Sequence, residues 1–209
     1  MPVVVVFGDS NSWGCEPQVF KRFPPGVRWP TVMKRELGAD YDLIEEALNG
    51  RTTVWDDPIE PHRSGIAYLT PCLLSHAPLD LVIIALGCND LKKRFSLSPS
   101  DIAYGAERLV VAARALPVGP NDSPPKVILM APPPLARLTD LAEMFEGGDA
   151  KSKLLGERYA VIAERQGVPL IDAGKHIRCS DRDGIHFEAD QHATLGRVAA
   201  QAVRAVLPG

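Results

Sequence analysis

Three short polar motifs contain the residue types that nucleophilic catalysis requires. They are GDSN at Gly8–Asn11, GCND at Gly87–Asp90 and DGIH at Asp183–His186. A serine hydroxyl is a weak nucleophile at neutral pH unless a base takes its proton and a third group orients that base. We therefore predict Ser10 as the nucleophile, His186 as the base and Asp183 as the group that orients the imidazole.

The spacing within and around these motifs supports the assignment. Because Asp183 and His186 are three residues apart, a turn places them on one face, where the carboxylate can accept a hydrogen bond from the imidazole. Asp9 adjoins Ser10, but neighbours along an extended chain point in opposite directions, so we expect Asp9 to brace the loop through backbone hydrogen bonds. His192, which follows an acidic residue by two positions, is the alternative candidate for the base.

Acyl transfer also needs hydrogen-bond donors aimed at the oxygen that becomes negatively charged. The predicted donors of this oxyanion hole are the backbone N–H of Ser10, the backbone N–H of Gly50 and the side-chain amide of Asn89. Gly50 has no side chain, so a substrate can approach its N–H closely. The three donors lie far apart in the sequence and therefore act together only if the fold brings their loops to one place.

Five short segments rich in apolar residues are predicted to be β-strands. They cover Val3–Phe7, Tyr41–Ala47, Asp80–Leu86, Lys126–Met130 and Val168–Asp172. Helices are predicted at Trp29–Leu37, Pro99–Leu116, Lys151–Gln166 and Ala189–Val206. Strands that alternate with helices form right-handed β-α-β units, and hence a mostly parallel sheet covered on both faces. The sequence therefore predicts an α/β fold, a three-layer α/β/α sandwich, with residues 1–209 forming a single domain.

The predicted topology accounts for the positions of the polar motifs. In a parallel α/β sheet, ligands bind outside the carboxyl ends of the strands. Each motif follows the end of a predicted strand, so all of them should lie along one edge of the sheet. The stretch Asp57–Pro78 shows no clear period, and we expect a long loop with a short helix that serves as a wall of the site or as an interface.

Charge and hydropathy exclude several classes of partner. Twenty-three Lys and Arg against 26 Asp and Glu give a net charge of −3 without long runs of either sign, which does not favour nucleic-acid binding. The longest apolar runs are far shorter than the ~20 residues that span a bilayer. The first residues lack a basic region and a small-residue cleavage site, so we expect a cytoplasmic protein without a signal peptide. The predicted partner is a small-molecule ester, with no nucleic acid and no membrane.

The cysteine pattern argues against a disulfide framework or a zinc module. The four cysteines are widely spaced and include no C-x-x-C pair: Cys15, Cys72, Cys88 and Cys179. We expect them to be reduced thiols that behave as small buried apolar residues. The chemistry predicted above needs no cofactor and no metal ion.

The motifs together resemble the four sequence blocks of the SGNH (GDSL-type) hydrolase superfamily. The blocks are Phe7–Ser10, Asn49–Gly50, Gly87–Asp90 and Asp183–Phe187. More narrowly, the chain is similar to the bacterial arylesterase/acyltransferase group typified by a mycobacterial acyltransferase. Further motifs carry this similarity: Trp13–Gly14, Arg51–Thr53, Asp56–Pro58 and Phe145–Gly148. The resemblance covers almost the whole chain.

The resemblance implies a flavodoxin-like sheet and the same triad and oxyanion hole that the residues indicate. It also implies a carboxylic ester hydrolase that cleaves short-chain aryl or alkyl esters through an acyl-enzyme on Ser10, with acyl transfer to alcohols or perhydrolysis as further reactions. A homo-oligomer such as an octamer is implied as well, with a narrow apolar entrance to the serine. Two positions depart from the group: Asn11 replaces the Leu of the usual GDSL block, and Gly50 replaces an Ala.

The residues that bind substrate around the serine are expected to be polar or aromatic. The candidates are Asn11, Trp13, Trp55 and Phe145, with Phe20 and Phe23 as further wall residues. Core packing is an equally good account of each aromatic side chain. Two other functions stay open at this point: a carbohydrate-ester or thioester hydrolase with the same triad, and a non-catalytic flavodoxin-like binding module.

Overall fold

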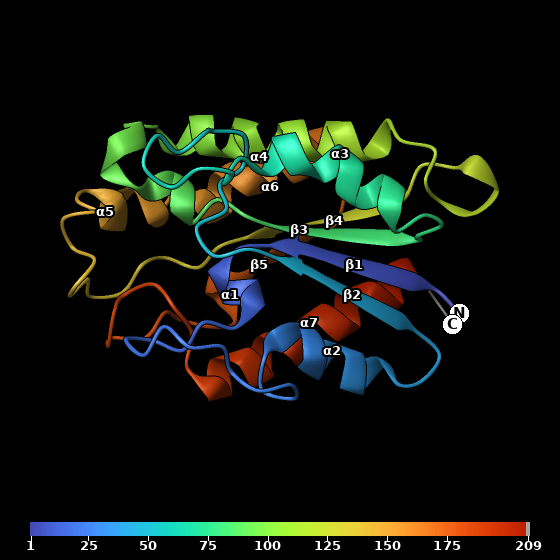
Figure 1. Ribbon diagram of the computed structural model, residues 1–209, viewed down its shortest axis with the longest axis horizontal. Coiled ribbons are helices and arrows are strands. Elements are labelled where there is room, and N and C mark those ends of the chain that lie inside the picture. The colour runs from blue at the N-terminus through green and yellow to red at the C-terminus, as the bar shows by residue number, and fades with distance from the viewer. Residues whose placement is uncertain (208–209) are drawn as a thin grey trace.

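The computed structural model describes residues 1–207, and a five-stranded parallel sheet lies at its centre (Figure 1). The strands are β1 (Val3–Gly8), β2 (Asp42–Ala47), β3 (Leu81–Ala85), β4 (Lys126–Ala131) and β5 (Leu170–Asp172). Their order in the sheet is β2-β1-β3-β4-β5, with every neighbouring pair parallel. This is the flavodoxin-like order, so the predicted α/β class and sheet are confirmed.

Helices cover both faces of the sheet. They are α1 (Ser10–Trp13), α2 (Trp29–Leu37), α3 (Gly65–Ser75), α4 (Pro99–Arg114), α5 (Gly148–Ser152), α6 (Leu155–Gln166) and α7 (Ala189–Val206). Helices α2 and α7 pack on one face, and α3, α4 and α6 on the other (Figure 1). None of the helices in residues 1–207 is long and apolar enough to cross a membrane.

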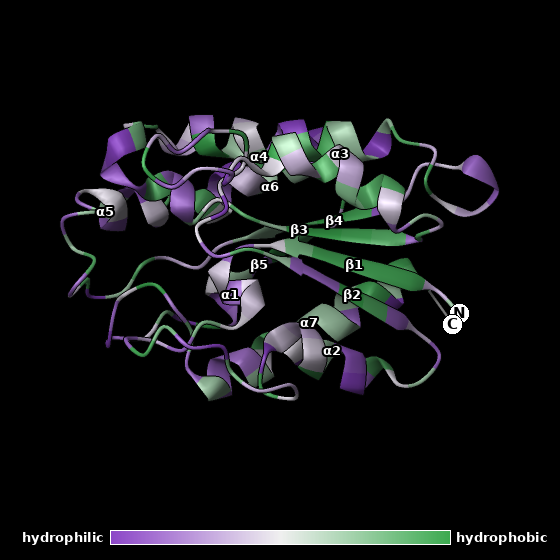
Figure 2. Ribbon diagram, viewed as in Figure 1, coloured by the Kyte–Doolittle hydropathy of each residue, from purple (hydrophilic) through white to green (hydrophobic). Residues whose placement is uncertain are grey.

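The hydropathy of the strands follows from their positions in the sheet. Figure 2 shows β1 and β3 as strongly hydrophobic and β2 as largely hydrophilic. Strands β1 and β3 lie inside the sheet between two helical layers, so both of their faces are buried. Strand β2 lies at the edge and is only partly covered, which explains the weaker apolar pattern of this segment. The four cysteines are buried free thiols, as expected.

Two predicted elements differ from the structure. The predicted helix Lys151–Gln166 is two helices, because α5 begins earlier, at Gly148, and ends at Ser152 before α6 begins at Leu155. The buried Ser152 hydroxyl accepts a hydrogen bond from the Leu135 N–H, which fixes the end of α5 against a loop. The segment Asp57–Pro78 contains a helix, as expected, but α3 is 11 residues long. The internal Pro71 and the lack of a polar stripe obscured its periodic pattern.

Gly87 determines the path of the chain from β3 into the Asn89 motif. Its φ of +121° is unfavourable for any residue with a side chain. A Cβ atom at Gly87 would lie 2.1 Å from the hydroxyl oxygen of Tyr159 on α6. That hydroxyl is buried and donates a 2.8 Å hydrogen bond to the Leu86 carbonyl, so Tyr159 cannot move without leaving an unpaired carbonyl.

We predict that Gly87→Ala lowers the free energy of unfolding by about 3 kcal/mol, because backbone strain and overpacking add at this position. Gly26→Ala is the matched control, since Gly26 also has a positive φ but a Cβ there meets nothing within 4 Å. The free energy of unfolding of this control should fall by only about 1 kcal/mol. Urea unfolding measures both, and equal losses in the two variants would contradict a role for Tyr159.

Candidate active site

Ser10 lies at the junction of β1 and the single turn of helix α1. Asp9 is the N-cap of this turn, and its carboxylate accepts a 2.9 Å hydrogen bond from the Asn11 N–H, as expected for a bracing residue. The turn ends at Gly14 in the left-handed conformation, whose N–H donates to the Ser10 carbonyl. Burial raises the pKa of Asp9 to about 6 against the opposing effect of these hydrogen bonds. The Asp9 cap and the Gly14 hydrogen bond therefore fix the backbone of Ser10 at the start of this single turn.

Ser10, His186 and Asp183 form a continuous chain of hydrogen bonds. The distance between Ser10 Oγ and His186 Nε2 is 3.0 Å, and the distance between His186 Nδ1 and Asp183 Oδ2 is 2.7 Å. All three residues are buried. The structure thus brings together the three residues selected from the sequence, in the order and at the distances that base-assisted nucleophilic attack requires.

Asp183 is held by hydrogen bonds to both of its carboxylate oxygens. Oδ1 accepts from the N–H groups of Ile185 and His186, each at 2.9 Å, and Oδ2 accepts from Gln18 N–H at 3.2 Å as well as from the imidazole. Burial by itself raises the pKa of Asp183, but these bonds and the charge of His186 lower it to about 2. The residue is therefore ionised at neutral pH and orients the imidazole.

The pKa of His186 reflects two opposing effects. Burial lowers it, while the hydrogen bond to Asp183 and the neighbouring Cys15 side chain raise it, and the net pKa lies above the ordinary value. With Nδ1 bound to the carboxylate, Nε2 is the nitrogen that faces the serine. The hydrogen bond at Nδ1 therefore increases the basicity of Nε2, the nitrogen that faces the serine hydroxyl.

The predicted oxyanion donors surround the same space. Ser10, Gly50 and Asn89 all line one pocket of about 170 Å³, together with His186. The Asn89 amide donates one bond to the Arg51 carbonyl at 3.1 Å, which fixes its orientation and leaves its second N–H for a ligand. Among residues 1–207, no backbone carbonyl accepts from the N–H of Ser10 or of Gly50. These donors can therefore point at a substrate oxygen.

The loops that carry these donors are tied together by Asp90. Its buried carboxylate accepts from the Thr53 N–H, with both distances 3.1 Å, and from the Thr53 hydroxyl. Burial is the main cause that raises the pKa of Asp90 to about 6. Since Thr53 follows Gly50 by three residues and Asp90 adjoins Asn89, this contact fixes two of the three donor loops relative to each other.

The pocket has one polar and one apolar side. Leu141, Met144, Ile185 and the predicted Phe145 form much of the apolar side. Phe20 also lines it, with its ring edge-on to His186 at a centroid distance of 6.1 Å. The polar side is formed by Asn49, Glu60 and Lys92.

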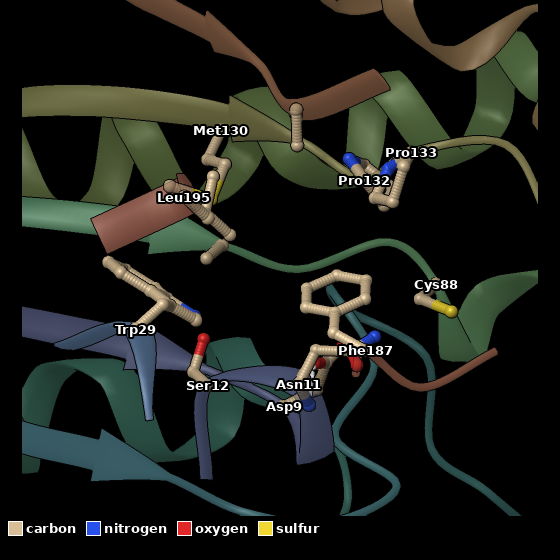
Figure 3. Close-up of a pocket in the computed structure, with 12 residues that line it drawn as sticks. Asp9, Asn11, Ser12, Trp29, Cys88, Met130, Pro132, Pro133, Phe187 and Leu195 are labelled. Atoms are coloured by element: carbon tan, nitrogen blue, oxygen red, sulfur yellow. Dashed lines mark hydrogen bonds between the residues drawn. The ribbon is translucent and has the colours of Figure 1, made fainter. Parts of the chain in front are cut away.

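Three of the predicted substrate-binding residues do not line this pocket. The Asn11 amide donates to the Ile185 carbonyl at 3.2 Å and faces a small cavity behind the serine, beside Phe187 (Figure 3). This placement does not support a substrate-binding role, because Asn11 is helical and its side chain points about 100° away from that of the preceding Ser10. Trp13 lies against the Arg22 guanidinium at 5.2 Å, and Trp55 is 37% exposed on the surface.

Two further candidates, His192 and Phe23, contact each other away from the serine pocket. His192 is buried, and its Nδ1 accepts a 3.3 Å hydrogen bond from the Trp29 N–H. Phe23 and Phe187 each contact its ring edge-on at 5.5 Å. Burial lowers the pKa of His192 to about 3, and the residue does not line the Ser10 pocket. The structure therefore does not support His192 as the base, or Phe23 as a wall residue.

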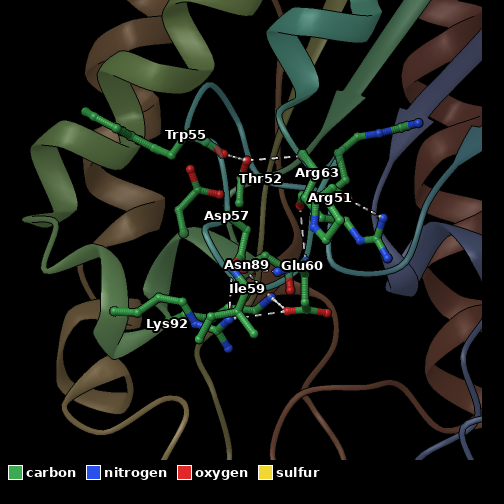
Figure 4. A network of polar contacts seen from close by, with 12 residues as sticks. Arg51, Thr52, Trp55, Asp57, Ile59, Glu60, Arg63, Asn89 and Lys92 are labelled. Atoms are coloured by element: carbon green, nitrogen blue, oxygen red, sulfur yellow. Dashed lines mark hydrogen bonds and ion pairs between the residues drawn. The ribbon is translucent and has the colours of Figure 1, made fainter.

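The sequence reasoning missed a buried ionic network beside the pocket (Figure 4). Lys92, only 2% exposed, contacts Asp57 Oδ2 at 3.3 Å and also pairs with Glu60, while Arg94 contacts Asp57 Oδ1 at 2.9 Å. Two backbone N–H groups cap the same Asp57 oxygen. The only sequence signal for a pocket role of Lys92 was its position three residues after Asn89. A single lysine in a chain of ordinary charge does not by itself predict a buried ion pair.

Comparisons with known proteins place the chain in a family. Residues 6–194 match the model of the GDSL-like lipase/acylhydrolase family. No curated protein matches the chain.

Three solved structures are similar over nearly the whole chain. An aryl esterase of M. smegmatis is 41% identical with a TM-score of 0.95, covering 99% of this chain and 100% of that one. Est24, a carbohydrate acetylesterase from Sinorhizobium meliloti, is 40% identical with a TM-score of 0.95 and the same coverage. A putative arylesterase from Agrobacterium tumefaciens is 35% identical with a TM-score of 0.90, also covering 99% and 100%. The chain therefore belongs to the GDSL-like lipase/acylhydrolase family.

Proposed function

We propose that this ester hydrolase cleaves short-chain esters through an acyl-enzyme on Ser10. The observation that carries the proposal is the unbroken hydrogen-bond chain from Asp183 through His186 to Ser10, at 2.7 and 3.0 Å. His186 Nε2 takes the hydroxyl proton as Ser10 Oγ forms a bond to the ester carbonyl carbon. Asp183 remains ionised and stabilises the imidazolium that results.

The donors around the pocket stabilise the negative charge that develops on the carbonyl oxygen. The N–H groups of Ser10 and Gly50 and the free N–H of Asn89 each stabilise that oxygen by an amount of about 3 kcal/mol when well aimed. When the tetrahedral intermediate collapses, the carbon–oxygen bond to the alcohol breaks and His186 returns the proton to the alcohol. Water then attacks the acyl-enzyme by the same steps, and the acid is released.

The proposal also covers which molecule accepts the acyl group from Ser10 in the second half-reaction. The apolar side of the pocket, which includes Phe145 and Met144, disfavours water relative to alcohols, so transfer to an alcohol or to peroxide competes with hydrolysis. A single domain over residues 1–209, a cytoplasmic location and assembly into a homo-oligomer belong to the same proposal. They rest on the sequence features and the resemblance given above.

A carbohydrate ester is the second candidate substrate. The polar side of the pocket, formed by Asn49, Glu60 and Lys92, offers hydrogen bonds to an alcohol group that carries hydroxyls. One of the similar structures is a carbohydrate acetylesterase. Rates on a sugar acetate and on an aryl acetate, compared at equal concentration, distinguish the two candidates.

We predict that a fluorophosphonate probe labels Ser10 and that Ser10→Ala abolishes the labelling. Ser10→Ala and His186→Ala should each lower kcat on an aryl acetate at least ~10³-fold, because triad residues act as a unit. Asp183→Asn should lower kcat by a smaller factor. Asp190→Asn, which changes an exposed carboxylate on the first turn of α7, is the control and should retain activity. Mass spectrometry locates the adduct, and a label elsewhere with full activity in Ser10→Ala would refute the proposal.

We predict that kcat/KM falls on acidification, since only the neutral imidazole can accept the serine proton. The raised pKa of His186 places this fall above the ordinary histidine range. Asp183→Asn removes the charge that raises this pKa, so the remaining activity should fall at a lower pH than in the parent enzyme. A pH–rate profile of both proteins measures the shift, and a flat profile down to pH values below ~5 would contradict a histidine base.

We predict that acetyl and other short acyl esters are the best substrates, because the pocket that opens beside Ser10 has a volume of only about 170 Å³. In a series from acetyl to dodecanoyl, each methylene that no longer fits should lower kcat/KM by roughly 10-fold. Met144→Ala, which shortens the apolar side, should move the optimum towards longer chains. Leu154→Ala changes an exposed leucine outside the pocket and should leave the profile unchanged.

A further inference from the structure

A second cluster of reactive side chains lies outside the serine pocket, between β2 and α3. Glu46 on β2, Cys72 on α3 and His76 at the end of α3 each offer one atom that can bind a metal, and these three atoms lie within 4.8 Å of one another. Glu46 Oε1 and His76 Nε2 are 2.6 Å apart. The mechanism proposed above for Ser10 does not involve these three side chains.

The local structure explains why the three side chains converge. Cys72 and His76 are four residues apart at the end of α3, so they project from the same side of the helix. Alternate residues of a strand share a face, and Ile44, two residues before Glu46, packs against the core cluster that contains Cys72. Glu46 therefore points at α3. The Tyr68 hydroxyl, one turn before Cys72, donates to Glu46 Oε2 at 3.4 Å and steadies the carboxylate.

A thiolate, an imidazole and a carboxylate form a ligand set that suits one kind of ion. Ca²⁺ and Mg²⁺ take oxygen ligands, whereas Zn²⁺ accepts sulfur, nitrogen and oxygen together. Zn²⁺ sites with three protein ligands keep a fourth position for water. Binding to a neutral thiol, a neutral imidazole and a carboxylate releases the thiol proton, so the bound site carries no net charge.

The cluster is accessible from the surface. The side chains of His76 and Glu46 are 27% and 21% exposed, while Cys72 is buried beneath them. Glu46 also lines an open pocket of about 550 Å³ with Tyr68, Arg51 and His62. An ion can therefore enter from this side, and a water can fill the fourth position.

The positively charged Arg51 packs beside the cluster and limits its affinity for a cation. Its Nη1 donates to the backbone carbonyls of Gly8, at 3.0 Å, and Glu46, at 2.6 Å, and forms no ion pair with the Glu46 carboxylate. The guanidinium lies over the rings of Phe7 and Tyr68, at 4.3 and 5.4 Å. Arg51 thus leaves the carboxylate oxygens to His76 and Tyr68, and a cation binds by replacing the contact between Glu46 and His76, although repulsion by Arg51 weakens its binding.

We propose that Glu46, Cys72 and His76 form a three-ligand site for Zn²⁺ between β2 and α3, separate from the serine pocket. Its ligands come from a C-x-x-x-H sequence on a helix and one strand residue. The absence of a C-x-x-C pair therefore excluded a common zinc module without excluding this site. In the unmetallated protein, the same groups form a hydrogen-bonded network around the Glu46 carboxylate.

The test is a titration of the full-length, reduced protein with Co²⁺, followed by displacement with Zn²⁺. We expect saturation at one equivalent, a thiolate-to-cobalt charge-transfer band, and d–d bands of the intensity typical of tetrahedral cobalt. Cys72→Ser should abolish the charge-transfer band, and His76→Ala and Glu46→Gln should weaken binding at least ~10-fold. Because His76 and Glu46 are partly exposed, these two variants keep the test valid if Cys72→Ser does not fold.

Two control variants separate the cluster from neighbouring groups. His62→Ala removes a histidine of the same pocket that is not in the cluster, and Cys179→Ser removes a buried cysteine elsewhere. Both should bind the ion as the parent protein does. Absence of the charge-transfer band, or binding that survives Cys72→Ser and His76→Ala unchanged, would overturn the proposal. Ser10→Ala should bind the ion normally, so the outcome does not depend on whether Ser10 is the nucleophile.

Discussion

The buried hydrogen bond between His186 Nδ1 and Asp183 Oδ2 is the interaction on which the proposed chemistry of this protein depends. A carboxylate removed from water is costly unless its oxygens are satisfied, and Asp183 meets this condition with three backbone N–H groups and the imidazole. Two of those N–H groups belong to the tight turn that also carries His186. The same turn therefore keeps the acid ionised and aims the base at the serine.

Ser10 and the oxyanion donors are positioned by the parallel sheet. Strands β1, β2 and β3 are adjacent, so the loops that follow them carry Ser10, Gly50 and Asn89 to one edge. Two contacts then fix the loops more finely than the strands do. Asp90 binds the loop of Thr53, and the Asn89 amide binds the Arg51 carbonyl, so the donor loops after β2 and β3 are joined through buried polar groups. A buried polar contact of this kind is costly to break, which favours a preorganised site.

Arg51 contacts both the serine pocket and the residues around the proposed zinc ligands. Its carbonyl orients Asn89 in the serine pocket, while its side chain binds the Gly8 and Glu46 carbonyls and covers Tyr68 beside the proposed zinc ligands. One residue thus contributes its backbone to the donor set and its side chain to the packing of the edge strand. The edge strand is also the most hydrophilic part of the sheet, so polar chemistry can lie on it without disturbing the core.

The sequence by itself determined the α/β class with its parallel sheet, and it singled out the Ser10, His186 and Asp183 set and the three oxyanion candidates. Buried parallel strands have long apolar runs, and the polar residues that interrupt them at their carboxyl ends stand out. Tertiary structure alone decided which side chains form the pocket. Asn11 turns away because α1 is helical, Trp55 lies on the surface, and Lys92 reaches the pocket along a path that no local pattern encodes. It also decided the Glu46, Cys72 and His76 cluster, because proximity between Glu46 on the edge strand and Cys72, 26 residues further along, depends on packing and not on spacing.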